Sequence, residues 1–224
     1  MLPTVACRYP FLVFVLFDLD GTLTDPYDGI SRSVAHALAQ MSKPALSIQQ
    51  LRAFIGPPLQ DCFSSLGLDN DDVALAVELY RERFSELGLY ENQVYGGIRE
   101  ALQALVASGT TLALATSKPL PFAERILDHF DLTKFFTAVG GATLNDSRRS
   151  KADVIAFALD QLNVCAGDAW MVGDRAQDII GAKEHGMSSV GVRWGYAEPG
   201  ELEAAGADVI VSTPGELVQV FRHP

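Results

Sequence analysis

Two aspartates, two positions apart, end the most apolar stretch in the first part of the chain. Residues 11–17 are all apolar and rich in aromatic and β-branched side chains, and they lead directly into residues 18–22, DLDGT. An unbroken apolar run of this length predicts a buried strand. Because side chains alternate along an extended segment, Asp18 and Asp20 point to the same side. Like charges this close repel, so we expect a divalent cation to compensate them.

Polar side chains also follow later apolar segments. They are Thr116, Ser117 and Lys118 after residues 111–115, Lys151 at the start of a helical pattern, and Asp174 after residues 170–172, with Asp178 four residues further on. Ligands of parallel α/β sheets bind at the carboxyl ends of the strands. We therefore expect these side chains to meet at one edge of a sheet.

Two kinds of pattern divide the chain. Residues 1–25 and 97–224 alternate short apolar strands with amphipathic helices, which predicts an α/β core with a parallel sheet and right-handed crossovers. Residues 26–96 contain no convincing strand, and their helical spacing predicts an inserted domain of four helices. These helices are expected over residues 30–41, 47–54, 59–66 and 73–87, the second opened by a capping box at Ser47. Strands of the core are expected over residues 11–17, 111–115, 135–139, 170–172, 189–193 and 209–211.

Composition narrows the classes of partner. The chain has 224 residues, of which 48% are hydrophobic, and a formal net charge of -11. Such an acidic protein is a poor ligand for nucleic acid or an anionic membrane, so an anionic substrate requires a local binding site. The three cysteines form no CxxC motif and predict neither a zinc site nor a disulfide scaffold.

The apolar run near the N-terminus is open to a second interpretation, a signal peptide. It leads directly into Asp18 and Asp20 without a small-residue cleavage site, and it is shorter than the about 20 residues of a membrane-spanning helix. We therefore expect a soluble cytoplasmic protein in which residues 1–8 form a loose leader.

At this point the motifs resemble a known family. The residues Asp18-x-Asp20-x-Thr22, Thr116, Lys151 and Gly173-Asp174-x3-Asp178 are similar, in type and order, to the four signature motifs of haloacid dehalogenase-type phosphatases. The resemblance covers essentially the whole chain. It implies a Rossmann-like core of that family with a helical cap over residues 26–96. Finer features, FIGPPL at 54–59, TSK at 116–118 and WGY at 194–196, resemble the phosphoglycolate phosphatase and 5′-nucleotidase-like branch.

The resemblance implies a role for each acid. Asp18 would be the nucleophile that forms an aspartyl-phosphate, and Asp20 would protonate the leaving group and then activate water. The family's dehalogenases lack an acid at the position of Asp20, which favours phosphoryl transfer. Mg²⁺ would be held by Asp18, the backbone carbonyl of Asp20 and Asp174. Asp178 would either support this site or cap a helix.

The remaining motif residues would bind the phosphoryl group. Thr116 would donate a hydrogen bond to it, and Lys151 would neutralise its developing charge and hold Asp18 in place. Backbone N–H groups of Leu19 and Asp20 would contribute. Ser117 and Lys118 belong to the same turn, and a surface position for Lys118 remains the alternative.

Several alternatives stay open from the sequence. The substrate would be a small phosphorylated metabolite, with phosphoglycolate or a nucleoside 5′-monophosphate favoured. A phosphomutase, a pyrophosphatase and a non-catalytic phosphate-binding protein are the competing functions. Specificity is expected in the cap, near Arg52, Ile55 and Gly56. Three arginines outside the motifs could contact a second anionic group of the substrate or be ordinary solvated charges, and the second interpretation is favoured: Arg148, Arg149 and Arg175.

Overall fold

A six-stranded parallel sheet forms the centre of the structure, with the strand order β5-β4-β1-β6-β7-β8. The computed structural model describes residues 13–145 and 147–221, so the expected leader and the first two residues of the expected first strand lie outside the described part. The strands are β1 (Phe14–Phe17), β4 (Thr111–Pro119), β5 (Phe136–Ala142), β6 (Ala169–Gly173), β7 (Ser188–Val192) and β8 (Val209–Val211). This topology confirms the predicted parallel α/β core.

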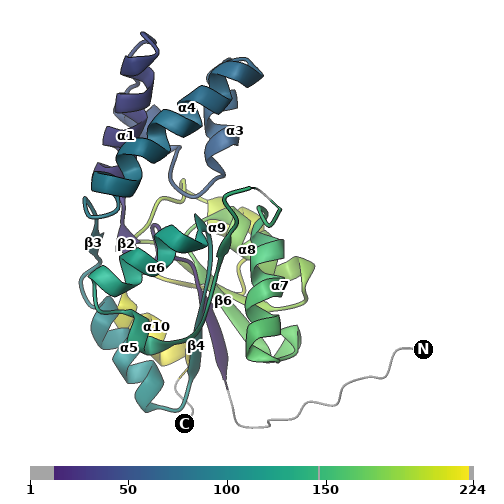
Figure 1. Cartoon of the computed structure of the whole chain (residues 1–224). Helices are drawn as coiled ribbons and strands as arrows, with labels where there is room; N and C mark the ends of the chain where they lie inside the picture. The colour runs from purple at the N-terminus through teal and green to yellow at the C-terminus, as the bar shows by residue number, and fades with distance from the viewer. Residues whose placement is uncertain (1–12, 146, 222–224) are drawn as a thin grey trace.

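Helices cover both faces of this sheet (Figure 1). They are α5 (Ile98–Ala107), α6 (Leu120–His129), α7 (Lys151–Leu162), α8 (Ala176–Glu184), α9 (Glu201–Ala205) and α10 (Pro214–Phe221), with short 3₁₀ turns at Thr133–Phe135 and Ala166–Asp168. Val15 and Phe17 of β1 pack into one apolar core, whereas Phe14 and Leu16 pack into a second core with α7. Both faces of β1 are therefore buried, which explains why the strand shows no polar alternation.

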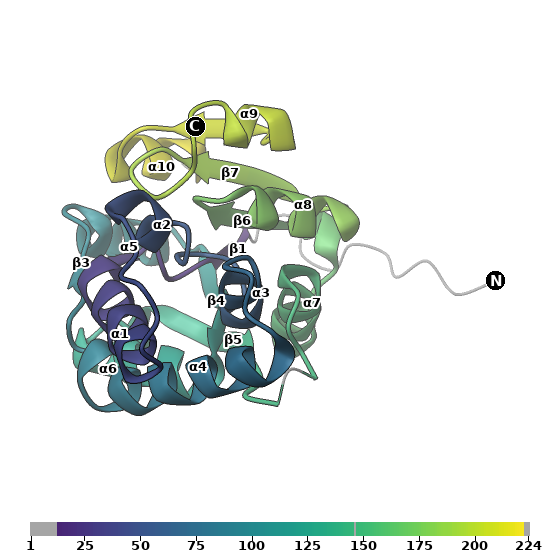
Figure 2. The same ribbon diagram turned by 90° about the horizontal axis from the view of Figure 1, so that it is seen from above.

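The helical insert lies above the carboxyl ends of the strands (Figures 1 and 2). Its helices are α1 (Tyr27–Gln40), α2 (Ile48–Arg52), α3 (Leu59–Ser64) and α4 (Asn70–Arg83), the last continuing into a π-helical turn, Phe84–Gly88. The capping box of α2 is present, because Ser47 Oγ accepts from Gln50 N at 3.3 Å and Gln50 Oε1 accepts from Ser47 N at 3.0 Å. The helical spacing over residues 73–87 predicts one apolar stripe, formed by Val73, Val77, Tyr80, Phe84 and Leu87. This prediction is wrong at Leu87, which is 56% exposed. The π-helical turn adds a residue to one turn and so rotates Leu87 out of the stripe.

A two-stranded antiparallel ribbon, β2 (Thr24–Asp25) and β3 (Gln93–Val94), joins the insert to the sheet. The expectation that no strand occurs between residues 26 and 96 is therefore wrong at β3. A strand of two residues is too short to leave an alternating pattern in the sequence. We propose that the ribbon marks the boundary between a cap domain, residues 26–96, and a core domain, residues 1–25 and 97–224.

Helix α9 was not expected from the sequence either; its five residues are too few for a helical period to stand out. Within the described residues, every helix is too short or too polar to span a lipid bilayer.

Candidate active site

The carboxyl ends of three neighbouring strands bring the expected acids together. Strand β1 lies between β4 and β6, so Asp18 after β1, Asp174 after β6 and Thr116 in the last part of β4 lie at the same edge of the sheet. The backbone N–H of Asp18 still donates to Val172 O of β6 at 2.9 Å. All three side chains are buried. The sheet topology thus assembles groups that are about 150 residues apart in sequence, as the rule for parallel sheets predicts.

Lys151 lies between two of the carboxylates. Its Nζ is 2.9 Å from Asp18 Oδ1 and 2.8 Å from Asp178 Oδ1, and it donates to Ala115 O at 3.1 Å. Burial lowers the pKa of Lys151, but the carboxylates of Asp178 and Asp18 outweigh that effect and raise it above its ordinary value. Lys151 is therefore a charged ammonium that fixes the orientation of Asp18.

Two hydrogen-bond donors hold Asp174, and the sequence had indicated no such role for either of them. Its Oδ1 accepts from Thr22 Oγ1 at 3.1 Å, and its Oδ2 accepts from the backbone N–H of Tyr196 at 2.8 Å. A Cβ on Gly21 would lie 2.2 Å from Oδ2 of Asp174, and one on Gly195 would lie 2.4 Å from the same atom. The glycine of the WGY segment therefore permits the close approach that places the Tyr196 N–H on this carboxylate.

A cluster of three buried carboxylates has the composition of a site for a hard divalent cation. One oxygen from each of Asp18, Asp174 and Asp178 lies within 4.8 Å of the others. Apart from the ammonium of Lys151, Oδ1 of Asp18 and of Asp178 have no hydrogen-bond partner among the described residues. Burial, then the charges of Asp178 and Asp18, raise the pKa of Asp174 well above its ordinary value. Three acids against one ammonium leave negative charge that oxygen-bound Mg²⁺ would neutralise.

Asp178 caps a helix, one of the two roles that the sequence left open, and also approaches Lys151. Its Oδ2 accepts from the backbone N–H of Arg175 at 3.0 Å, which caps α8, and its Oδ1 faces Lys151. Burial raises its pKa and Lys151 opposes that rise. A Cβ on Gly173 would lie 2.2 Å from the Asp178 carboxylate, so the glycine of the motif makes room for it.

The second aspartate of the first motif pairs with Lys118. Lys118 Nζ lies 2.7 Å from Asp20 Oδ2, and both side chains are largely buried. Burial raises the pKa of Asp20, and Lys118 partly opposes the rise. Asp20 Oδ1 has no hydrogen-bond partner among the described residues. The alternative of a surface position for Lys118 is therefore wrong.

Ser117 and Leu19 were also expected at the phosphate site, but only Ser117 has its side chain at the cavity. Ser117 lines a cavity beside Asp20, whereas the side chain of Leu19 is fully buried in the core. Any contact of Leu19 with a ligand is therefore made by its backbone.

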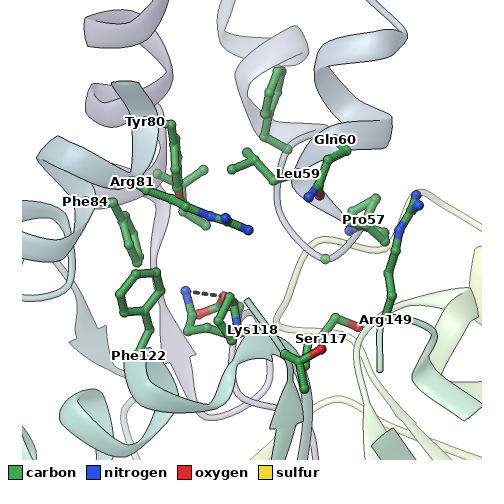
Figure 3. Close-up of a pocket in the computed structure, with 18 residues that line it drawn as sticks. Pro57, Leu59, Gln60, Tyr80, Arg81, Phe84, Ser117, Lys118, Phe122 and Arg149 are labelled. Atoms are coloured by element: carbon green, nitrogen blue, oxygen red, sulfur yellow. Dashed lines mark ion pairs between the residues drawn. The ribbon is translucent and has the colours of Figure 1, made fainter. Parts of the chain in front are cut away.

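A cavity of about 90 Å³ lies between the insert and the core (Figure 3). Of the expected specificity residues, only Gly56 lines it. Arg52 instead lies over the ring of Tyr196, with 4.7 Å from its guanidinium carbon to the ring centroid, and Ile55 is buried. Tyr80 and Arg81 of α4 also line the cavity. Tyr80 was expected only as part of the apolar stripe of this helix, and the sequence indicated no role for Arg81.

Arginines on the core contact the insert. Arg175 donates through Nη1 to Ile55 O at 2.5 Å and through Nε to Glu201 at 2.9 Å, so its expected role as a solvated charge is wrong. Arg149 forms an ion pair with Asp61 of α3. Arg148 stays within the core, where it donates to Gly141 O at 2.7 Å.

Comparison with known proteins places the chain in a family. A sequence profile of the haloacid dehalogenase-like hydrolases matches residues 15–192. A protein of Pseudomonas aeruginosa named 5′-nucleotidase is 46% identical, over 89% of each chain. The tyrosine-protein kinase PtkA of Mycobacterium tuberculosis is 39% identical over 88% of this chain and 67% of its own.

Comparison of the fold with solved structures indicates the same family. The crystal structure of a predicted phosphatase from Clostridium acetobutylicum superposes with a TM-score of 0.89 and 40% sequence identity, covering 92% of this chain and 96% of the other. Together with the match of the family profile over most of the chain, this similarity shows that the protein belongs to the haloacid dehalogenase-like hydrolases.

Proposed function

We propose that the protein is a Mg²⁺-dependent phosphomonoester hydrolase that works through an aspartyl-phosphate. The observation that carries the proposal is the position of Asp18. It is a buried carboxylate at the carboxyl end of β1, and it lies 2.9 Å from the ammonium of Lys151. The names of similar proteins, 5′-nucleotidase and phosphoglycolate phosphatase, support phosphatase chemistry.

The first step would be attack by a carboxylate oxygen of Asp18 on phosphorus. A P–O bond to Asp18 forms while the P–O bond to the leaving group breaks. Asp20 donates its proton to the departing oxygen, a task that its raised pKa favours. In the second step the Asp20 carboxylate takes a proton from a water molecule that attacks phosphorus, which releases phosphate and regenerates Asp18.

The other expected residues would position and neutralise the phosphoryl group. Thr116, Ser117, Lys118 and the backbone N–H groups at Leu19 and Asp20 would hydrogen-bond its oxygens. Lys151 would offset the charge that develops in the transition state.

Mg²⁺, bound by the carboxylates of Asp18 and Asp174 and the backbone carbonyl of Asp20, would supply further charge neutralisation and orient the phosphate. The closeness of Asp178 to Asp18 and Asp174 supports its role in fixing this site. A small phosphorylated metabolite as substrate and a cytoplasmic location stay predictions.

Replacement of Asp18 by Asn tests the mechanism. The amide lacks the charge of the nucleophile, so we expect Mg²⁺-dependent turnover of phosphate esters to fall by at least about 1,000-fold, a scale that removal of a covalent nucleophile commonly reaches. Asp131→Asn, at an exposed aspartate paired only locally with Lys134, is the matched control and should keep full activity. Thermal unfolding of both variants checks the fold. Retained turnover in Asp18→Asn would reject the mechanism.

Hydrolysis in isotopically labelled water separates a phosphatase from a phosphomutase. We expect one labelled oxygen in each released phosphate, because water attacks phosphorus in the second step. A mutase would return the phosphoryl group to an alcohol, so phosphate without label would contradict hydrolysis by this enzyme.

A further inference from the structure

The cavity between insert and core carries an excess of positive charge. Its charged lining residues are Asp20, Arg81, Lys118 and Arg149, although the whole chain has a net charge of -11. Lys118 is paired with Asp20, and Arg149 with Asp61. Arg81 has no ion pair among the described residues, and its guanidinium makes a single hydrogen bond there, of 3.4 Å, to Leu144 O. Figure 3 shows Arg81 pointing into the cavity, across from Lys118 and Ser117.

Tyr80 adds a second group without a partner. Its side chain is only 7% exposed, it lines the same cavity, and its hydroxyl forms no hydrogen bond within the part of the chain that the structure describes. The hydroxyl oxygen itself is not a buried atom, so it is accessible from the cavity and can donate a hydrogen bond to a ligand there. Arg81 and Tyr80 therefore offer donors to a ligand on the side of the cavity opposite Asp20.

The aromatic rings of the cavity are already engaged with one another. Tyr80 stacks on Phe84 with ring centroids 5.1 Å apart, and Lys118 Nζ lies 4.5 Å from the centroid of the same ring. Tyr80 and Lys118 therefore both cover part of the Phe84 ring. Phe122 meets Phe84 edge to face at 5.8 Å. Three neighbours thus contact the ring of Phe84, which does not favour stacking of a nucleobase on it.

We infer that the leaving group of the substrate is small and carries a second anionic group, a carboxylate or a phosphate, which binds Arg81 and Tyr80. This inference rests on the proposed phosphatase function and specifies its substrate class. The scissile phosphate lies on the side of Asp20 and Lys118, and the second anion lies on the side of α4. A planar guanidinium with several donors suits either anion.

Pairs of esters that differ in the second anion test the inference. The first pair is 2-phosphoglycolate against 2-hydroxyethyl phosphate, which lacks the carboxylate. The second is glycerol 1,3-bisphosphate against glycerol 1-phosphate. For each pair we define the selectivity as a ratio of two kcat/KM values: that of the ester with the second anionic group, divided by that of the ester without it. We expect a selectivity of at least about tenfold in one pair, and the pair identifies which anion is bound.

Arg81→Gln should lower that selectivity by about tenfold to 100-fold, the loss expected for a hydrogen bond to a charged group. Arg81→Lys keeps the charge without the planar fork and should lose part of the selectivity. Tyr80→Phe should lower it as well. Arg32→Gln, which removes the same charge from an arginine that is 54% exposed outside this cavity, should leave it unchanged.

Two results would overturn the inference. The first is a result with the wild-type protein. Its selectivity is near unity in both pairs, or it turns over a nucleoside 5′-monophosphate faster than both 2-phosphoglycolate and glycerol 1,3-bisphosphate. The other is unchanged selectivity in Arg81→Gln, or, where that variant does not fold, in both Arg81→Lys and Tyr80→Phe. Failure of the proposed function is a separate result, in which the wild-type protein hydrolyses none of these esters with Mg²⁺.

Discussion

At the scale of single residues, Thr22 positions one of the carboxylates that we propose as Mg²⁺ ligands. Its hydroxyl donates to Asp174 Oδ1 at 3.1 Å, and it is completely buried. Replacement by Val keeps the shape and removes the donor. Because partners of a ligating carboxylate commonly change metal affinity by about 10- to 100-fold, we expect the Mg²⁺ concentration for half-maximal activity to rise at least about tenfold in Thr22→Val.

The control for this prediction is a threonine with a similar hydrogen bond on the surface. Thr133 donates to Asp128 far from the site, and Thr133→Val should leave the Mg²⁺ dependence unchanged. Thermal unfolding with and without Mg²⁺ gives a measurement that is independent of turnover. Equal Mg²⁺ dependence in Thr22→Val and the wild type would show that the hydroxyl does not tune the site.

The sequence predicted the charged residues at the strand ends better than the backbone donor from Tyr196 and the residues of the helical insert. Asp18, Lys151 and Asp174 follow strand ends or begin a helix, so the rules for parallel sheets could bring them together. The donor from Tyr196 is a backbone N–H, and no residue type marks such a group. Arg81 lies on an ordinary amphipathic helix, and its position over the cavity depends on how the insert packs, which periodicity does not encode.

At the scale of elements, Glu91 ties together the base of the helical insert. It pairs with Arg83 of α4 at 2.7 Å and with Arg32 of α1 at 2.8 Å, just before β3. The hydrogen bonds from Arg83, with a further contribution from Arg32, lower the pKa of Glu91 to about 2. The sequence predicted helices α1 and α4 but not this connection, because the partners lie 59 and 8 residues away from Glu91.

Replacement of Glu91 by Gln should destabilise the fold in a pH-dependent way. The pKa of Glu91 is lower in the folded than in the unfolded chain, so its contribution is complete above about pH 4.5 and is lost as the pH falls toward about 2. We expect Glu91→Gln to lower the free energy of unfolding by about 1 kcal/mol at pH 7, since solvent screens this partly exposed network. Urea unfolding at pH 7 and pH 3 measures the difference, which should shrink at pH 3.

Glu86→Gln is the control for this experiment, because Glu86 is exposed on the adjacent π-helical turn. It should change the free energy of unfolding by less than about 0.5 kcal/mol at either pH. A difference between Glu91→Gln and the wild type that stayed constant from pH 7 to pH 3 would contradict a charge-based role for Glu91.

At the scale of the whole molecule, the insert lies closed on the core and is joined to it by a ribbon of only two short strands. Arginines span the gap at separate points: Arg175 donates to Ile55 O, Arg149 pairs with Asp61, and Arg52 lies over Tyr196. Arg125 of the core also donates to Ser85 O, and Arg81 of the insert donates to Leu144 O. If a substrate binds in the cavity beneath the insert, some of these contacts must break to admit it.

Removal of two of these contacts should therefore open the molecule. In the double variant Arg149→Gln with Arg175→Gln, loss of about 2 kcal/mol of contact free energy would raise the ratio of open to closed molecules about 30-fold. We expect a larger radius of gyration in small-angle X-ray scattering and faster proteolysis near the ribbon. The double variant Lys134→Gln with Arg193→Gln changes the net charge equally at exposed side chains of the core and should behave as the wild type does. An unchanged radius of gyration in the first variant would mean that apolar packing, and not these arginines, holds the insert closed.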